Sequence, residues 1–333
     1  MSKQWLITGG CGFIGTNLVR RLVQEGGHAI RVLDNLSVGS LGDLQSVALV
    51  VELDTASGAF PRLSEGQCQL IRGDISDEAL ALRAAVGMDV IVHLAANTGV
   101  GPSVENPRAD CLANVMGTLN YLEAARLNGV RRFVFASSGA PAGEVEPPIH
   151  EELAPHPVSP YGASKLAGEG YCSAYKRTFG IDTVALRFGN VYGPGSTHKS
   201  SVVAKFIRRA LDGQPLEIFG DGRQTRDFIY IDDLVEAVLL AAQRADVGGE
   251  IFQIATNHET TVGEMTERLV LTLERAGIER PKVVHGENRL GDVKRNFSDT
   301  SKAGRHLGWQ ARTSLDEGLA KTVAFFHEAQ ARS

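Results

Sequence analysis

The chain has 333 residues, a formal net charge of −5 and 43% hydrophobic residues, which is typical of a globular protein with a sizeable buried core. The mild acidity and the lack of any basic run argue against nucleic acid as a partner. No apolar stretch approaches the roughly 20 residues of a membrane-spanning helix, and the amino terminus has no signal-peptide pattern. The four cysteines are scattered, without metal-ligand spacing or a disulfide framework, so we predict a cytoplasmic protein with no metal site.

Short apolar runs alternate with amphipathic runs in the first half of the chain, which is the pattern of βαβ units around a parallel sheet. Strands are predicted at 5–8, 29–33, 68–71, 90–94, 132–136 and 183–188. Helices are predicted between them, at 13–25, 77–86, 105–128 and 160–178. Residues 39–67 are less regular and carry Gly, Ser and Pro, so we interpret them as a loop with at most one short helix.

The sequence pattern changes after residue 188, where segments rich in Gly and Pro separate short predicted strands from helices. The helices predicted there are 200–212, 232–244, 262–276 and 314–331. The sequence therefore predicts an α/β fold: a doubly wound parallel sheet with a smaller C-terminal α/β lobe. We place residues 1–188 mainly in the first domain and residues 189–333 mainly in the second, with some chain crossing between the two.

A glycine-rich turn follows the first predicted strand and opens the first predicted helix. Residues 8–15 read Thr-Gly-Gly-Cys-Gly-Phe-Ile-Gly, in which Gly9, Gly12 and Gly15 permit a tight turn and let backbone amides approach a pyrophosphate. Asp34 ends the second predicted strand, 19 residues past Gly15. A carboxylate at that place accepts hydrogen bonds from ribose hydroxyls and repels a 2′-phosphate. The combination predicts a Rossmann-type dinucleotide site that prefers NAD to NADP.

Other residues at strand ends are predicted to line this cofactor site. Asp74 follows the strand at 68–71 and can hydrogen-bond the adenine, although an ordinary helix cap is the alternative. The small residues Ala95 and Ala96 let a cofactor pass close to the strand that ends at His93, which we interpret as a core residue. The predicted cofactor-binding residues are Gly9, Gly12, Phe13, Ile14, Gly15, Asp34, Asn35, Asp74, Ile75, Leu94, Ala95, Ala96, Asn114, Tyr161 and Lys165.

Tyr161 and Lys165 lie four residues apart at the start of a predicted helix, which places the phenol and the ammonium on one helical face. A lysine held near a phenol favours the phenolate and lowers the tyrosine pKa from about 10, which makes a usable general base. Ser138 ends an apolar strand and can hold a substrate oxygen. We therefore predict Ser138, Tyr161 and Lys165 as the catalytic residues, although Tyr-x-x-x-Lys by itself is a common pattern.

With the glycine turn, Asp34, Ser138, Tyr161 and Lys165 in this order, the chain resembles the extended short-chain dehydrogenase/reductases over essentially its whole length. It is most similar to their nucleotide-sugar branch, which includes UDP-sugar 4-epimerases, uronate decarboxylases and sugar 4,6-dehydratases. The resemblance implies a Rossmann domain with tightly held NAD and a small lobe that binds the nucleotide diphosphate. It also implies a homodimer formed through the helices near 105–128 and 160–178.

Three later motifs resemble the substrate-binding segments of this family. In residues 187–194, the family's Asn that contacts the sugar diphosphate corresponds to Asn190. Residues 220–228 resemble a nucleotide-contacting stretch with Arg226 as a phosphate ligand, and guanidinium groups suit phosphate oxygens because they bind them bidentately. Arg289 and Asp292 match a second clamp, on the diphosphate and on a uridine ribose respectively. The implied substrate-binding residues are Ser138, Asn190, Arg226, Arg289 and Asp292.

The same resemblance implies how these residues act. Tyr161 takes the proton from the sugar 4-hydroxyl while NAD takes a hydride from C4, and Ser138 hydrogen-bonds the reacting oxygen. Lys165 holds the nicotinamide ribose and tunes Tyr161. Asn114 matches a position that braces this active site, although a purely structural polar contact is the alternative.

The reaction that follows oxidation at C4 depends on the residues after Ser138. The dehydratases usually carry an Asp-Glu pair there and the decarboxylases a Glu, whereas residues 139–143 read Gly-Ala-Pro-Ala-Gly. The missing carboxylates predict 4-epimerisation of a UDP-sugar, in which the 4-ketose turns and receives the hydride back on its opposite face. Glu144 and Glu146 follow closely, so a 4,6-dehydratase, a uronate decarboxylase or a ketoreductase stays open as an alternative. A non-catalytic NAD-binding sensor is the remote one.

The same segment also departs from the epimerases, which usually read Val-Tyr-Gly at residues 141–143. Loss of the Tyr removes bulk near the sugar and favours a bulkier or charged substituent, unless the change is neutral drift. The candidate substrates are therefore UDP-glucose, UDP-glucuronate and UDP-N-acetylhexosamine, as donors for polysaccharide biosynthesis.

Overall fold

The computed structural model describes residues 2–56, 58–197, 201–287 and 294–331. The chain divides into two compact units, of which unit 1 comprises Met1–Glu144, Glu151–Arg187 and Ala237–Phe252. Unit 2 comprises Val145–His150, Phe188–Glu236 and Gln253–Ser333. No helix in the described ranges is long and apolar enough to cross a membrane.

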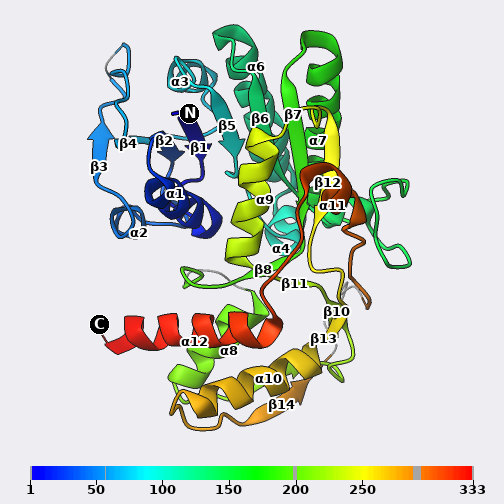
Figure 1. The fold of residues 1–333 in the computed structure, drawn as a ribbon. Helices are drawn as coiled ribbons and strands as arrows, with labels where there is room; N and C mark the ends of the chain where they lie inside the picture. Colours follow the sequence, from blue (N-terminus) through cyan, green and yellow to red (C-terminus); the bar gives the residue numbers. More distant parts are fainter. Residues whose placement is uncertain (1, 57, 198–200, 288–293, 332–333) are drawn as a thin grey trace. The chain divides into compact units, whose positions relative to one another are not determined.

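An eight-stranded sheet, counted over the described residues, forms the centre of unit 1 (Figure 1), in the order β3-β4-β2-β1-β5-β6-β7-β12. The pairs β1–β2, β1–β5, β2–β4, β3–β4 and β5–β6 are parallel. The strands are β1 (Gln4–Thr8), β2 (Ala29–Asp34), β3 (Val50–Leu53), β4 (Cys68–Arg72), β5 (Val90–His93), β6 (Arg132–Ser138), β7 (Asp182–Phe188) and β12 (Glu250–Ile254). The chain moves outward from β1 through β2 and then returns to β5 on the other side of β1, which is where ligands bind in doubly wound sheets.

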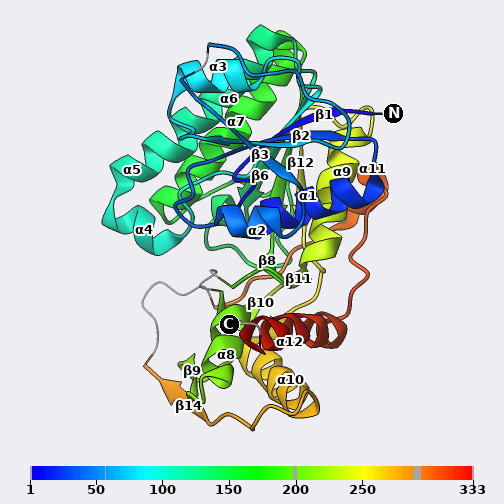
Figure 2. The ribbon, with the colours of Figure 1, turned by 90° about the vertical axis from the view of Figure 1, so that its left-hand side faces the viewer.

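Helices cover both faces of this sheet (Figures 1 and 2), with α1 and α9 on one face and α3, α6 and α7 on the other. Because both faces are covered, the central strands are continuous apolar runs, and Trp5, Leu6 and Ile7 are completely buried. The helices are α1 (Phe13–Glu25), α2 (Leu41–Gln45), α3 (Glu78–Ala84), α4 (Val100–Glu105), α5 (Pro107–Cys111), α6 (Gly117–Asn128), α7 (Pro160–Phe179) and α9 (Ile231–Gln243). The first six residues of α9 belong to unit 2.

Two sequence predictions for this unit were wrong. The stretch 105–128 is not one helix: α5 restarts at Pro107, where the side chain of Asn106 caps the amide of Ala109, and a π-helical turn at Leu112–Met116 precedes α6. The region 39–67 contains β3 as well as the short helix α2. The strand β3 lies at the edge of the sheet with exposed side chains, and it therefore lacks the apolar pattern that identified the other strands.

Unit 2 combines helices with short strand pairs. Within the described residues the pairs are β8–β11, β9–β14 and β10–β13. The strands are β8 (Asn190–Tyr192), β9 (Leu216–Phe219), β10 (Thr225–Arg226), β11 (Phe228–Tyr230), β13 (Thr260–Thr261) and β14 (Val283–Gly286). The helices are α8 (Val202–Leu211), α10 (Val262–Arg275), α11 (Ser301–Leu307) and α12 (Leu315–Ala331). The predicted helices at 262–276 and 314–331 correspond to α10 and α12.

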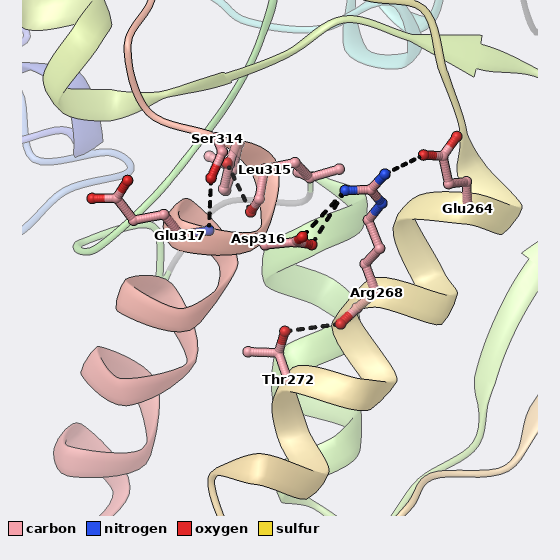
Figure 3. A network of polar contacts seen from close by, with 8 residues as sticks. Glu264, Arg268, Thr272, Ser314, Leu315, Asp316 and Glu317 are labelled. Carbon is pink, nitrogen blue, oxygen red and sulfur yellow. Dashed lines mark hydrogen bonds and ion pairs between the residues drawn. The ribbon is translucent and has the colours of Figure 1, made fainter.

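An exposed polar network joins α10 to α12 (Figure 3). Arg268 donates to Glu264 on its own helix at 2.8 Å and to Asp316 on α12 at 3.3 Å. Ser314 accepts a hydrogen bond from the amide of Glu317, so its side chain caps the start of α12. The network ties two surface helices together without burying a charge.

Candidate active site

The turn between β1 and α1 brings backbone segments closer than side chains would allow. A Cβ at Gly15 would collide with the carbonyl oxygen of Gly9, and Gly9 has a φ of 71°, which glycine adopts readily. Helix α1 has no acidic residue in its first turn, and Gly12 offers no side chain to cap it. The helix amino terminus is therefore built to receive an anion.

Asp34 at the end of β2 is tied to the glycine turn. Its Oδ2 accepts a hydrogen bond from the amide of Cys11 at 2.9 Å, and its Oδ1 accepts one from the amide of Leu36 at 2.8 Å. Burial raises the pKa of Asp34, although the two amide hydrogen bonds act in the opposite direction. The predicted ribose-binding carboxylate thus lies directly beside the predicted pyrophosphate turn.

The predicted adenine-binding residues form a second cluster after β2 and β4. Asn35 donates to Asp74 at 2.8 Å, and Asp74 also accepts hydrogen bonds from the amide and hydroxyl of Ser76. Burial acts to raise the pKa of Asp74, but these hydrogen bonds outweigh it and lower the pKa. The cap of α3 is Asp77, whose side chain accepts from the amide of Leu80, so Asp74 does not cap that helix. Ile75, the next predicted residue, is buried.

The segment after β5 lies against the glycine turn. The amide of Leu94 donates to the carbonyl of Thr8, and the amide of Ala95 donates to the Thr8 hydroxyl at 3.3 Å. A Cβ at Gly9 would come within 2.8 Å of the Ala95 nitrogen, so the two segments touch through their backbones. His93 is buried, and its Nδ1 is 2.8 Å from the Thr8 hydroxyl. Burial lowers the pKa of His93 to about 3, which suits the predicted core role.

Helix α7 positions the predicted catalytic pair. Ser159 caps the helix by accepting from the amide of Gly162, and Pro160 occupies its first position. Lys165 is buried one turn after Tyr161, with its Nζ 5.0 Å from the ring centroid of Phe135. The ammonium donates to the carbonyl of Ala136 at 2.9 Å, which is its one hydrogen bond within the described residues. Burial lowers the pKa of Lys165 to about 8.

The predicted lowering of the Tyr161 pKa was wrong for this structure. Burial raises the pKa of Tyr161, although a hydrogen bond with Ser138 acts to lower it. Lys165 does little to lower the pKa of Tyr161, because its Nζ donates a hydrogen bond to the Ala136 carbonyl and lies 5.9 Å from the centre of the Tyr161 ring. Ser138 and Tyr161 are nevertheless hydrogen-bonded to each other.

Asn114 links the segment after β5 to α7. Its Oδ1 accepts from the amide of Asn97 at 2.7 Å, and its Nδ2 faces the carbonyl of Asn97 at 2.9 Å. The same Nδ2 faces Asp110 Oδ1 at 2.9 Å and the hydroxyl of Ser164 at 3.1 Å. Asn114 lies in the π-helical turn and is 2% exposed, so it braces the residue that precedes Lys165. Asp110 and Ser164 were not predicted, although the four-residue spacing from Asp110 to Asn114 was a signal for this contact.

A buried ion pair lies one turn further along α7. Arg187 on β7 binds Glu169 through two hydrogen bonds of 2.8 Å, and the side chains are 2% and 1% exposed. The hydroxyl of Ser137 donates to the same carboxylate. The sequence placed Arg187 only within a substrate motif and missed this pair, since nothing local connects residues on α7 and β7.

The segment after Ser138 forms a short 3-10 turn, Ala140–Ala142, and carries no carboxylate. Ala142, at the position where the epimerases usually have Tyr, is completely buried. The smaller residue therefore does not open a solvent-filled space at this point. In unit 2, Glu146 is held by Arg295, which also binds Glu259 bidentately at 2.8 and 2.9 Å.

Unit 2 contains a cavity of about 340 Å³ that holds two of the predicted substrate-binding residues, Asn190 and Arg226. Lys205 supplies a further cation there, 5.2 Å from the ring centroid of Phe219. Arg289 and Asp292 lie outside the described residues. No group of three or more His, Cys, Asp or Glu side chains in the described ranges is arranged to hold a metal ion.

Comparisons with known proteins agree with this architecture. Residues 5–255 match the NAD dependent epimerase/dehydratase family. A UDP-glucose 4-epimerase of Mycolicibacterium smegmatis is 37% identical over 326 residues, which cover 96% of this chain and 97% of that protein. A dTDP-glucose 4,6-dehydratase of Actinoplanes is 33% identical over 328 residues, 96% and 97% of the two chains.

The crystal structure of a UDP-glucose 4-epimerase of Thermotoga maritima with UDP-glucose superposes with a TM-score of 0.86 at 35% identity. The superposition covers 98% of this chain and 99% of that one. The fold is therefore that of the Rossmann-type epimerases and dehydratases, as predicted. The chain belongs to the NAD-dependent epimerase/dehydratase family.

Proposed function

We propose that this protein is an NAD-dependent UDP-sugar 4-epimerase. The observation that carries the proposal is the hydrogen bond between Tyr161 and Ser138, close to the buried Lys165. The turn that follows Ser138, at residues 139–143, contains no carboxylate. These groups suit removal and return of a proton at one carbinol, and the turn supplies no additional acid or base for elimination.

The glycine turn fits NAD. Gly9, Gly12 and Gly15 leave backbone space at the uncapped start of α1, where the pyrophosphate would be held. Asp34 would hold the adenosine ribose, and Lys165 the nicotinamide ribose. NAD, when bound, supplies reversible hydride transfer.

The protein's own residues manage the proton. Tyr161 accepts it from the sugar 4-hydroxyl, while Ser138 hydrogen-bonds the same oxygen and holds it in place. The resulting 4-ketose turns in the site, and Tyr161 returns the proton after its opposite face is reduced. Lys165 carries its positive charge below about pH 8, since burial lowers its pKa to about 8.

We propose that the cavity of unit 2 binds the nucleotide diphosphate. Asn190, Lys205 and Arg226 give it hydrogen-bond donors and positive charge, which suit phosphate oxygens, and its volume of about 340 Å³ is that of a small-ligand pocket. Arg289 and Asp292 remain proposed as a second clamp on the diphosphate and the uridine ribose. UDP-glucose, UDP-glucuronate and UDP-N-acetylhexosamine are the candidate substrates, and the buried Ala142 gives no support for an enlarged sugar pocket.

A nucleotide-sugar dehydratase is the second candidate, favoured by the similarity to dTDP-glucose 4,6-dehydratase. Elimination needs an additional acid and base near the 4-ketose. Residues 139–143 offer neither, and the Glu146 side chain is 82% exposed in its pair with Arg295. These features favour epimerisation.

We further propose a homodimer. Four apolar side chains on the helices from 100 to 116 are 44–60% exposed, and an interface would bury them. They are Val100, Val104, Leu112 and Met116. The four cysteines are free, which supports a cytoplasmic location, and a galacto-configured product would serve polysaccharide biosynthesis.

The proposed reaction is tested by incubating the purified protein with each candidate UDP-sugar, without added cofactor, and identifying the products by NMR. We expect the 4-epimer of at least one substrate and no net change in the redox state of NAD. A 4-keto-6-deoxy sugar or a pentose as the product would instead identify a dehydratase or a decarboxylase. The Tyr161→Phe protein is the control for background conversion.

A further inference from the structure

Asp110 is a buried carboxylate whose charge acts on both Tyr161 and Lys165 and which the proposed chemistry does not use. It lies on α5 and is 1% exposed. Its Oδ1 faces the Nδ2 of Asn114 at 2.9 Å. Its other oxygen, Oδ2, is buried and has no hydrogen-bond partner among the described residues. Burying a carboxylate with one oxygen lacking a hydrogen bond destabilises the fold, unless a nearby positive charge offsets the loss of hydration.

The charges around Asp110 identify that positive charge. Lys165 is a buried cation on which the charge of Asp110 acts, and the buried Glu169 also acts on Lys165. Glu169 is bound bidentately by Arg187 and acts on Lys165 only through space, so Lys165 has no carboxylate in contact among the described residues. Asp110 and Lys165 are thus buried charges of opposite sign, and neither has an ion-pair partner among the described residues.

We propose that Asp110 is the buried counter-charge of Lys165 and a positioning residue for the Tyr161–Lys165 pair. The proposal rests on the proposed function, since it assigns Asp110 to the same active site. Asp110 acts at a distance through its charge, and through Asn114, whose Nδ2 also faces Ser164 next to Lys165. It touches neither the substrate nor the reacting atoms.

The direction of the electrostatic effect follows from the groups that face the pair. Lys165 is faced by Asp110 from α5, by Glu169 and Cys172 from its own helix, and by the neutral His93 from β5. After burial, which lowers it, the negative charge of Asp110 acts most strongly to raise the pKa of Lys165.

Tyr161 is faced by Ser138 and by Asp110. Burial raises the pKa of Tyr161, the Ser138 hydrogen bond lowers it, and Asp110 raises it further. Because a negative charge raises the pKa of both Tyr161 and Lys165, its removal must lower both.

The test is the Asp110→Asn variant of the holoenzyme, which keeps an oxygen for Asn114 and removes the charge. We expect the kcat–pH profile to move to lower pH by about one unit, because loss of the negative charge lowers the pKa of both Tyr161 and Lys165. The near-ultraviolet absorbance of the Tyr161 phenolate, measured against a Tyr161→Phe partner of each protein, should titrate at lower pH by a similar amount. Asp110→Glu, which keeps the charge, should titrate close to the wild type.

Glu105→Gln is the matched control, because it removes an exposed carboxylate from the neighbouring helix α4. It should leave both measurements unchanged. An Asp110→Asn profile that falls in height without moving along the pH axis, or an unchanged phenolate titration, would overturn the proposal in favour of a purely structural residue. If Asp110→Asn does not fold, Asp110→Ser gives the same neutral test with a smaller side chain. The absorbance titration needs no substrate, so it decides the role of Asp110 even if none of the UDP-sugars is converted.

Discussion

Two arginine–glutamate contacts in this protein have the same length and very different surroundings. Arg187 meets Glu169 at 2.8 Å beneath the active site, where the side chains are 2% and 1% exposed. Arg268 meets Glu264 at 2.8 Å on the surface of unit 2, where they are 39% and 40% exposed (Figure 3). Bond length therefore says little about what either contact does.

The difference between the two contacts lies in hydration. Water surrounds Arg268 and screens its attraction to Glu264 and Asp316, so these pairs contribute little. Arg187 and Glu169 have lost their water, so each depends on the other, and the charge of Glu169 also acts on Lys165. The buried pair belongs to the electrostatics of the active site, whereas the exposed network only joins two helices.

The largest effect is expected on activity, at the proposed general base Tyr161. Tyr161→Phe should lower kcat by about 10²–10⁴-fold, because it removes the proposed general base. Thermal unfolding and bound NAD should stay close to the wild type, and steady-state assays with the converted UDP-sugar provide the measurement. Retention of full turnover by this variant would refute the proposed base.

The next largest effect is expected from breaking the buried pair. Arg187→Met should lower the free energy of unfolding by about 3–5 kcal/mol, because it leaves Glu169 buried without its partner. Denaturant unfolding measures the change. The double variant Arg187→Met with Glu169→Gln should recover much of the loss, and equal stability of the single and double variants would show that the charge of Glu169 does not matter.

A smaller loss of stability is expected at the buried, uncharged side chain of Asn114. Asn114→Ala should cost about 1–3 kcal/mol of unfolding free energy, because the amide of Asn97 and Asp110 both lose their partner. Hydrogen exchange at the Asn97 amide should speed up in the variant. Unchanged exchange there would contradict the bracing role.

The smallest effect is expected at the exposed network. Arg268→Ala should change the free energy of unfolding by less than about 1 kcal/mol, and the change should shrink as salt is added. Lys321→Ala, at an exposed pair with Glu317 on α12, is the matched control and should behave alike. A loss at Arg268 as large as that for Arg187→Met would remove the contrast between the two contacts.

Much of the fold was predictable because the signals are local. The glycines of residues 8–15, Asp34 and the spacing from Tyr161 to Lys165 each act within one turn or one βαβ unit, and the structure has each of them in the predicted element. The strand β3 was missed because an edge strand with exposed side chains carries no apolar pattern. Pro107 indicates a break in the helix, but the helical pattern on both sides of it led to the prediction of one continuous helix.

The sequence by itself determined the family, and it predicted the cofactor turn and the catalytic triplet, since these follow from residue types at short spacings. Only the tertiary structure decided the electrostatics of the site. It brought Asp110 from α5 and Arg187 from β7 to the surroundings of α7, and it gave Tyr161 a raised pKa where the spacing had predicted a lowered one. Burial and the field of distant charges are properties of the packed chain, so no local pattern contains them.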